Sequence, residues 1–88
     1  MSKKQRQTLD AIFTKPDRAN ILWDDIEDLF IGLGAKVSYG SGSIVRVILS
    51  DVVAVFHRPH PQKETYKSAE RRVRRYLIEA GIGPDAEV

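Results

Sequence analysis

Apolar residues along this chain recur first with helical spacing, then alternate as in strands, and finally return to helical spacing. The clearest helical face lies in residues 22–33 and consists of Leu22, Ile26, Leu29, Phe30 and Leu33. This spacing is typical of an amphipathic helix that buries one side. A narrower stripe predicts a first helix over residues 3–14. A third helix, over residues 65–80, is predicted by a stripe of Tyr66, Ala69, Val73, Tyr76, Leu77 and Ala80.

Between the second and third helices the pattern changes to a period of two residues. Residues 35–39, 44–49 and 52–56 alternate apolar and polar side chains or are rich in β-branched residues, which predicts three short strands. Gly40–Ser43 and Ser50-Asp51 separate the strands with turn-forming residues. The last two strands should therefore pair as an antiparallel hairpin.

The predicted order is helix, helix, strand, strand, strand, helix, within one domain that covers residues 1–88. A three-stranded antiparallel sheet with the helices on one face is the simplest α+β arrangement that buries every apolar stripe. Gly34 and Gly81 follow the second and third helices, where a left-handed cap favours glycine. Residues 83–88 form an acidic tail that we expect to be frayed.

Charge is distributed unevenly along the chain. Residues 1–34 hold five basic and six acidic residues, whereas residues 36–80 hold nine basic and four acidic residues. The basic second half favours an anionic partner. The absence of cysteine fits a reducing, cytoplasmic environment, and no apolar run approaches the length of a membrane span.

Four acidic residues crowd the first turns of the second predicted helix: Asp24, Asp25, Glu27 and Asp28. A carboxylate cluster could bind a metal ion. A simpler interpretation is that these side chains are solvated and complement the helix dipole, which favours negative charge at a helix N-terminus.

Basic residues are concentrated around the third helix. They are Arg58, Lys63, Lys67, Arg71, Arg74 and Arg75. Such a cluster can neutralise several phosphates and is typical of an RNA-binding surface. Gly42 and Ser43 in the first turn could also let the backbone approach a phosphate closely. The alternatives are a helix face that only confers solubility and a surface that docks an acidic protein.

Both histidines lie in the connector His57–Glu64, which also contains two prolines. Cleavage of RNA without a metal requires a base, an acid and a cation that stabilises the phosphorane. His57, His60 and Arg58 supply all three types of group. Each histidine could instead cap a helix or bind a carbonyl. A zinc site at His57 and His60 is a third option, but no further ligands lie nearby in the sequence.

Three segments carry a resemblance to a known family. The segment Trp23–Ala35 resembles the opening helix and glycine turn of HicA-type toxins, and Gly42-Ser43 is similar to their glycine-serine motif. The block His60–Glu64 and the basic helix that ends at Ala80-Gly81-Ile82 resemble their closing segment. The resemblance covers residues 21–82 and leaves residues 1–20 as an N-terminal helical extension.

The resemblance implies a fold like that of the double-stranded-RNA-binding domain and an mRNA endoribonuclease that needs no metal or cofactor. It also implies a hetero-oligomeric complex with a HicB-like antitoxin. The family's catalytic histidine, however, follows the glycine-serine pair, where this chain has Ile44. We therefore expect His60, in the matching block, or else His57 to transfer the proton. The alternative is a non-catalytic RNA-binding or protein-interaction module of the same fold.

Overall fold

The computed structural model describes residues 1–15, 20–59 and 63–86. Its helices are α1 (Lys3–Phe13), α2 (Trp23–Gly32) and α3 (Lys67–Glu79), and its strands are β1 (Lys36–Tyr39), β2 (Ile44–Leu49) and β3 (Val52–His57). The order ααβββα confirms the predicted α+β class and is consistent with a fold like that of the double-stranded-RNA-binding domain. No helix in the described ranges is long and apolar enough to cross a membrane.

The strands form one antiparallel sheet in the order β1-β2-β3. Ser50 and Asp51 join β2 to β3, and both have positive φ angles, 52° and 65°. Two consecutive positive φ angles are what a tight two-residue hairpin turn requires. The turn sets the register, which begins at the pair Leu49↔Val52 and ends at Ile44↔His57.

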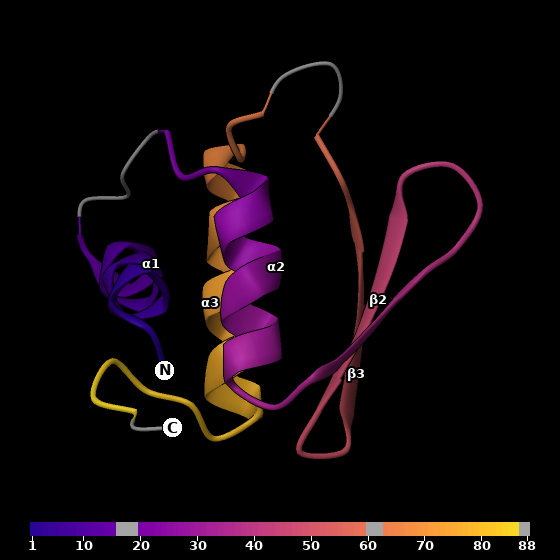
Figure 1. The fold of residues 1–88 in the computed structure, drawn as a ribbon. Coiled ribbons are helices and arrows are strands. Elements are labelled where there is room, and N and C mark those ends of the chain that lie inside the picture. Colours follow the sequence, from indigo (N-terminus) through magenta and orange to yellow (C-terminus); the bar gives the residue numbers. More distant parts are fainter. Residues whose placement is uncertain (16–19, 60–62, 87–88) are drawn as a thin grey trace.

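Helices α2 and α3 both lie on one side of the sheet, with α2 in front of α3 in the view of Figure 1. The core between these layers includes an aromatic cluster in which Phe30 lies 5.8 Å from Phe56 and 6.0 Å from Tyr76, measured between ring centroids. The hydroxyl of Tyr76 donates to the carbonyl of Val52 at 2.7 Å. Apart from the N-cap residues Leu22 and Tyr66, which are exposed, the predicted stripes of α2 and α3 therefore meet the alternating face of the hairpin.

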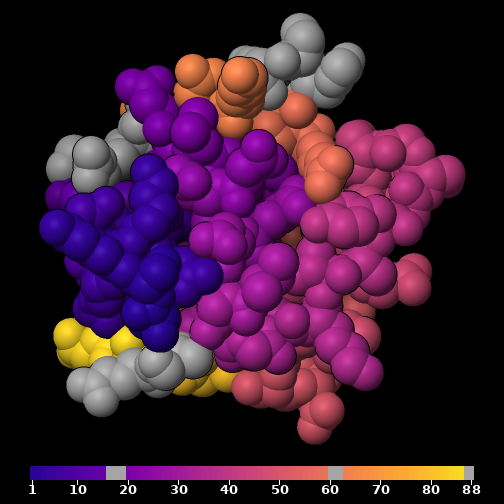
Figure 2. All heavy atoms as spheres, viewed as in Figure 1, coloured from indigo at the N-terminus to yellow at the C-terminus, as the bar shows by residue number. Residues whose placement is uncertain are grey.

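Helix α1 packs on the outside of the helix pair, away from the sheet (Figures 1 and 2). Leu9 and Ile12 are completely buried. The side-chain amide of Gln5 donates to the carbonyl of Asp28 at 3.1 Å, and Arg74 Nε donates to the carbonyl of Ile12 at 2.8 Å. The N-terminal extension thus shares the core of the domain.

The expectation that Tyr66 is buried is wrong. Tyr66 is 60% exposed, because α3 begins one residue later and Tyr66 is an N-cap with extended backbone, so helical spacing does not apply to it. The described part of the tail contacts α1, where the guanidinium of Arg6 donates to the carbonyls of Pro84 and Ala86. Figure 2 shows the tail beside α1.

Candidate functional site

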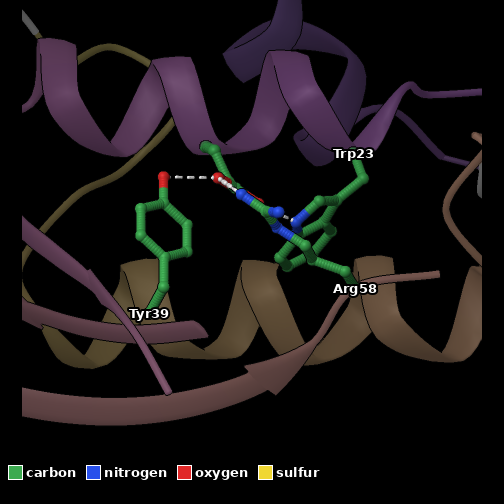
Figure 3. A network of polar contacts seen from close by, with 4 residues as sticks. Trp23, Tyr39 and Arg58 are labelled. Carbon is green, nitrogen blue, oxygen red and sulfur yellow. Dashed lines mark hydrogen bonds and ion pairs between the residues drawn. The ribbon is translucent and has the colours of Figure 1, made fainter. Parts of the chain in front are cut away.

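A buried carboxylate organises one end of the sheet. Glu27 lies on α2, is 6% exposed, and receives hydrogen bonds from three side chains. The indole Nε1 of Trp23, one turn earlier on the same helix, donates to Oε2. Tyr39, at the end of β1, donates its hydroxyl to Oε1 at 2.8 Å. Arg58, which follows β3, completes the set (Figure 3).

Arg58 is held on several sides. Its Nε lies 2.9 Å from Oε2 of Glu27 and its Nη2 lies 3.1 Å from Oε1, which is a bidentate ion pair. Its Cζ lies 4.5 Å from the centroid of the Tyr39 ring, in a cation–π contact. Its backbone N–H donates to the carbonyl of Ser43 at 2.8 Å. The guanidinium is therefore fixed in orientation although its side chain is 44% exposed.

The network also determines the protonation of its members. Burial by itself raises the pKa of the Glu27 carboxyl, but the hydrogen bonds from Arg58, Tyr39 and Trp23 and the charge of Arg58 outweigh it and leave this pKa below its ordinary value. The hydrogen bond to Glu27, aided by burial, raises the pKa of Tyr39. The same carboxylate, chiefly through its hydrogen bond, raises the pKa of Arg58. At neutral pH the site therefore holds a carboxylate, a phenol and a guanidinium.

Two open hollows lie beside Arg58. One, of about 570 Å³, is lined by Gly42, Ser43, Arg58 and Pro59. The other, of about 300 Å³, is lined by Ser43, Arg58 and Pro59 together with Trp23, His57, Thr65, Tyr66 and Ala69. The predicted residues Gly42, Ser43, His57 and Arg58 thus meet at one end of the sheet.

The hairpin register places His57 directly opposite Ile44. Directly paired residues of antiparallel strands point to the same face, with Cβ atoms about 4.5–5.5 Å apart. The open face of the sheet therefore presents an imidazole next to Ile44. Arg46 pairs with Val55, so it lies diagonally from His57 on that same face.

The remaining predicted residues are more spread out. The carbonyl of Lys63 accepts a hydrogen bond from the backbone of Trp23 at 3.0 Å, which ties the connector to α2. Lys67, Arg71 and Arg75 are exposed at intervals of one turn along α3, whereas Arg74 is half-buried and contacts α1. His60 lies outside the described residues.

Sequence reasoning misses Glu27 as a site residue, because its position among Asp24, Asp25 and Asp28 is typical of a solvated helix end. The available signal was the spacing Trp23-x-x-x-Glu27, which places an indole donor one turn from a carboxylate. Arg46 could be placed on the open face but not beside His57. In the described ranges, no three acidic or histidine side chains are grouped so that they could hold a metal ion.

Comparison with known proteins identifies the family. The sequence model described as the HicA toxin of bacterial toxin–antitoxin systems matches residues 23–82. No curated protein and no solved structure matches the chain. The matched segment begins at Trp23, at the start of α2, and ends at Ile82, just after α3, so it contains the whole sheet and the Glu27 network. The chain therefore belongs to the HicA family of toxins.

Proposed function

We propose that this protein is the toxin of a type II toxin–antitoxin pair and that it binds and cleaves mRNA as a metal-independent endoribonuclease. A HicB-like antitoxin would hold it inactive in a cytoplasmic hetero-oligomeric complex. The family supports the toxin and its pairing with an antitoxin. The basic side chains near the connector and along α3 support an RNA ligand, because they can neutralise successive phosphates.

The reaction that fits these side chains is an internal phosphoryl transfer. A base takes the proton of a ribose 2′-hydroxyl, and the 2′-oxygen attacks the adjacent phosphorus. The bond from phosphorus to the 5′-oxygen breaks, an acid protonates the leaving oxygen, and a 2′,3′-cyclic phosphate remains. Cationic groups stabilise the charge on the phosphorane.

The observation that carries the proposal is the cross-strand pair Ile44↔His57. Isoleucine cannot transfer a proton, so cleavage by this chain needs a proton-transfer group from another position. His57 supplies one from the neighbouring strand, on the same sheet face and within one side-chain width. We therefore place His57 ahead of His60 as the proton-transfer residue.

Arg46 is the cation best placed to assist His57. Diagonal neighbours across an antiparallel pair lie about 7–8 Å apart, a distance that a long arginine side chain can span. Arg46 is exposed, so a phosphate can reach it. Arg58 lies at the same end of the sheet, but its side chain extends toward the helices, where it binds Glu27.

The test is to move the imidazole from position 57 to position 44, across the paired strands. Purified parent protein should cleave mRNA in the presence of a chelator, and His57→Gln should reduce the rate by about 10²–10⁴-fold, the range typical of general acid–base catalysis. The double variant Ile44→His/His57→Gln should regain much of the lost rate. Growth arrest after induced expression should follow the same order.

His60→Gln is the matched control, because it removes an imidazole from the same connector. A folded His57→Gln variant that cleaves like the parent would show that His57 does not transfer the proton. Loss of cleavage in His60→Gln alone would return the role to His60.

A second candidate function is RNA binding without cleavage, which Ile44 favours because it removes the family's proton-transfer group. In that case the parent protein would bind RNA and leave it intact, and Ile44→His alone would create activity.

A further inference from the structure

The hollow of about 300 Å³ lies between the end of β3 and the start of α3. Its lining combines flat aromatic surfaces with polar groups. Trp23 and Tyr66 supply the aromatic surfaces, and Ser43, Arg58 and Thr65 supply the polar groups. A ligand that fits this hollow should therefore have both a flat face and a polar edge.

The two aromatic residues are held differently. Trp23 is only 3% exposed, its indole N–H is bound to Glu27, and its ring lies 5.8 Å from that of Phe56. Tyr66 is 60% exposed, although an exposed aromatic ring gives up the stabilisation that burial would provide. One aromatic group thus forms a fixed wall, and the other stands at the rim with its ring accessible.

One polar group of the hollow has no hydrogen-bond partner in the part of the chain that the structure describes. Thr65 is 4% exposed, and its hydroxyl Oγ1 is buried with no hydrogen-bond partner among the described residues. Its backbone cannot easily move away, because its N–H donates to the carbonyl of Ile21 at 2.7 Å. A buried hydroxyl without a partner costs free energy. Because Thr65 lines the hollow, a ligand that reaches this hydroxyl would gain by supplying the missing partner.

The start of α3 adds a second feature that attracts an anion. The N-cap Tyr66 gives no side-chain hydrogen bond to the first turn, and the helix dipole favours negative charge at this end of the helix. The same turn already holds the buried carboxyl side chain of Glu70, which is 1% exposed. Ala69 of this turn lines the hollow. Arg58, oriented by Glu27, lines it as well, and exposed Lys63 and Lys67 flank this segment in sequence.

We propose that this hollow binds one unstacked nucleobase of single-stranded RNA, with its phosphate between Arg58 and the start of α3. Tyr66 stacks on the base, and Thr65 and Ser43 contact its polar edge. Single-stranded RNA is recognised in this way, by stacking on aromatic rings and by hydrogen bonds to base edges. The proposal rests on the proposed RNA function and adds a binding site for a base next to the proton-transfer position.

The experiment uses a short 2′-O-methyl oligoribonucleotide, which cannot be cleaved through a 2′-hydroxyl. Trp23 is the only tryptophan in the chain, so its fluorescence reports on the hollow directly. Tyr66→Ala should weaken binding by about 5- to 150-fold, the range for loss of one stacked base. Tyr66→Phe, which keeps the ring, should bind like the parent. An abasic chain of the same length should bind the parent weakly and should not respond to Tyr66→Ala.

Ile78→Ala is the matched control, because Ile78 is 58% exposed on α3 but lies outside the hollow. It should bind like the parent. Unchanged binding in a folded Tyr66→Ala variant would overturn the base site. The exposed ring would then serve another contact, such as one with a protein partner. The proposal that the protein cleaves RNA would not be affected by this result. A parent protein that neither binds the oligonucleotide nor cleaves mRNA would instead overturn the proposed function itself.

Discussion

Arg58 binds both carboxylate oxygens of Glu27, with its Nε 2.9 Å from one and its Nη2 3.1 Å from the other. This ion pair joins α2 to the end of β3, and the two residues that form it are 31 positions apart in the sequence. It therefore fixes the helix layer against the end of the sheet at which the candidate site lies.

Replacement of Glu27 by Gln should destabilise the protein at neutral pH. The amide keeps the size of the side chain but removes its charge and turns one acceptor into a donor that faces Arg58 and Trp23. The free energy of unfolding should fall by on the order of 1–3 kcal/mol, as measured by urea denaturation. A variant as stable as the parent would show that the network does not hold the layers together.

The same variant should change the acid limb of the stability profile. The pKa of Glu27 is lower in the folded protein than its ordinary value of 4.5, so its contribution is fully present above that value and is lost as the pH falls through the lowered folded pKa. The stability difference between parent and Glu27→Gln should shrink below about pH 4.5. A difference that stays constant in acid would contradict this linkage.

Leu77→Ala should destabilise the protein by ~2–5 kcal/mol. Leu77 is completely buried on α3 in the same cluster as Val73 and Phe30, so removing its methyl groups leaves a cavity. Thermal or urea unfolding followed by circular dichroism measures the effect. Ile78→Ala, on the exposed side of the same helix, is the control and should change stability by less than about 0.5 kcal/mol.

Three arginines of α3, namely Arg71, Arg74 and Arg75, should differ in what they do. Arg74→Gln should lower stability by about 1–2 kcal/mol, because Arg74 bonds the carbonyl of Ile12 and thereby holds α1. Arg71→Gln/Arg75→Gln should lower stability less, because both side chains are exposed. It should instead flatten the salt dependence of RNA binding, by about 0.7 in logarithmic slope for each phosphate that the variant no longer neutralises.

Affinity titrations at several salt concentrations distinguish these outcomes. An unchanged slope in the double variant would place the RNA elsewhere on the surface. A loss of RNA binding in Arg74→Gln without any loss of stability would assign that residue to the RNA as well.

The hairpin turn offers a route to a more stable protein. Ser50 and Asp51 both adopt positive φ, a region that costs most residues other than glycine about 1–2 kcal/mol each. Asn-Gly is the pair preferred for two positive φ angles. Ser50→Asn/Asp51→Gly should therefore raise the melting temperature, with a gain in stability of up to about 1 kcal/mol. A lower melting temperature would indicate that the hydroxyl or carboxylate stabilises the turn in another way.

The sequence by itself determined the order and type of the elements. The helical stripe of α2 and the alternation along β2 are local patterns, and each dictates which face must be buried. Gly34 and Gly81, with φ angles of 89° and 84°, end their helices where the sequence predicts left-handed caps. The family resemblance likewise depended on residues close together in the chain.

Tertiary structure alone decided which of the charged and aromatic residues meet. Glu27 became a buried centre, rather than a solvated end, because Tyr39 and Arg58 reach it from 12 and 31 residues away. Tyr66 lost its predicted place in the core because α3 starts after it. His57 came to lie opposite Ile44 only through the register of the hairpin. The physical reason is that periodicity states which side of an element is buried, whereas the partner of a polar group depends on how the packed layers are aligned.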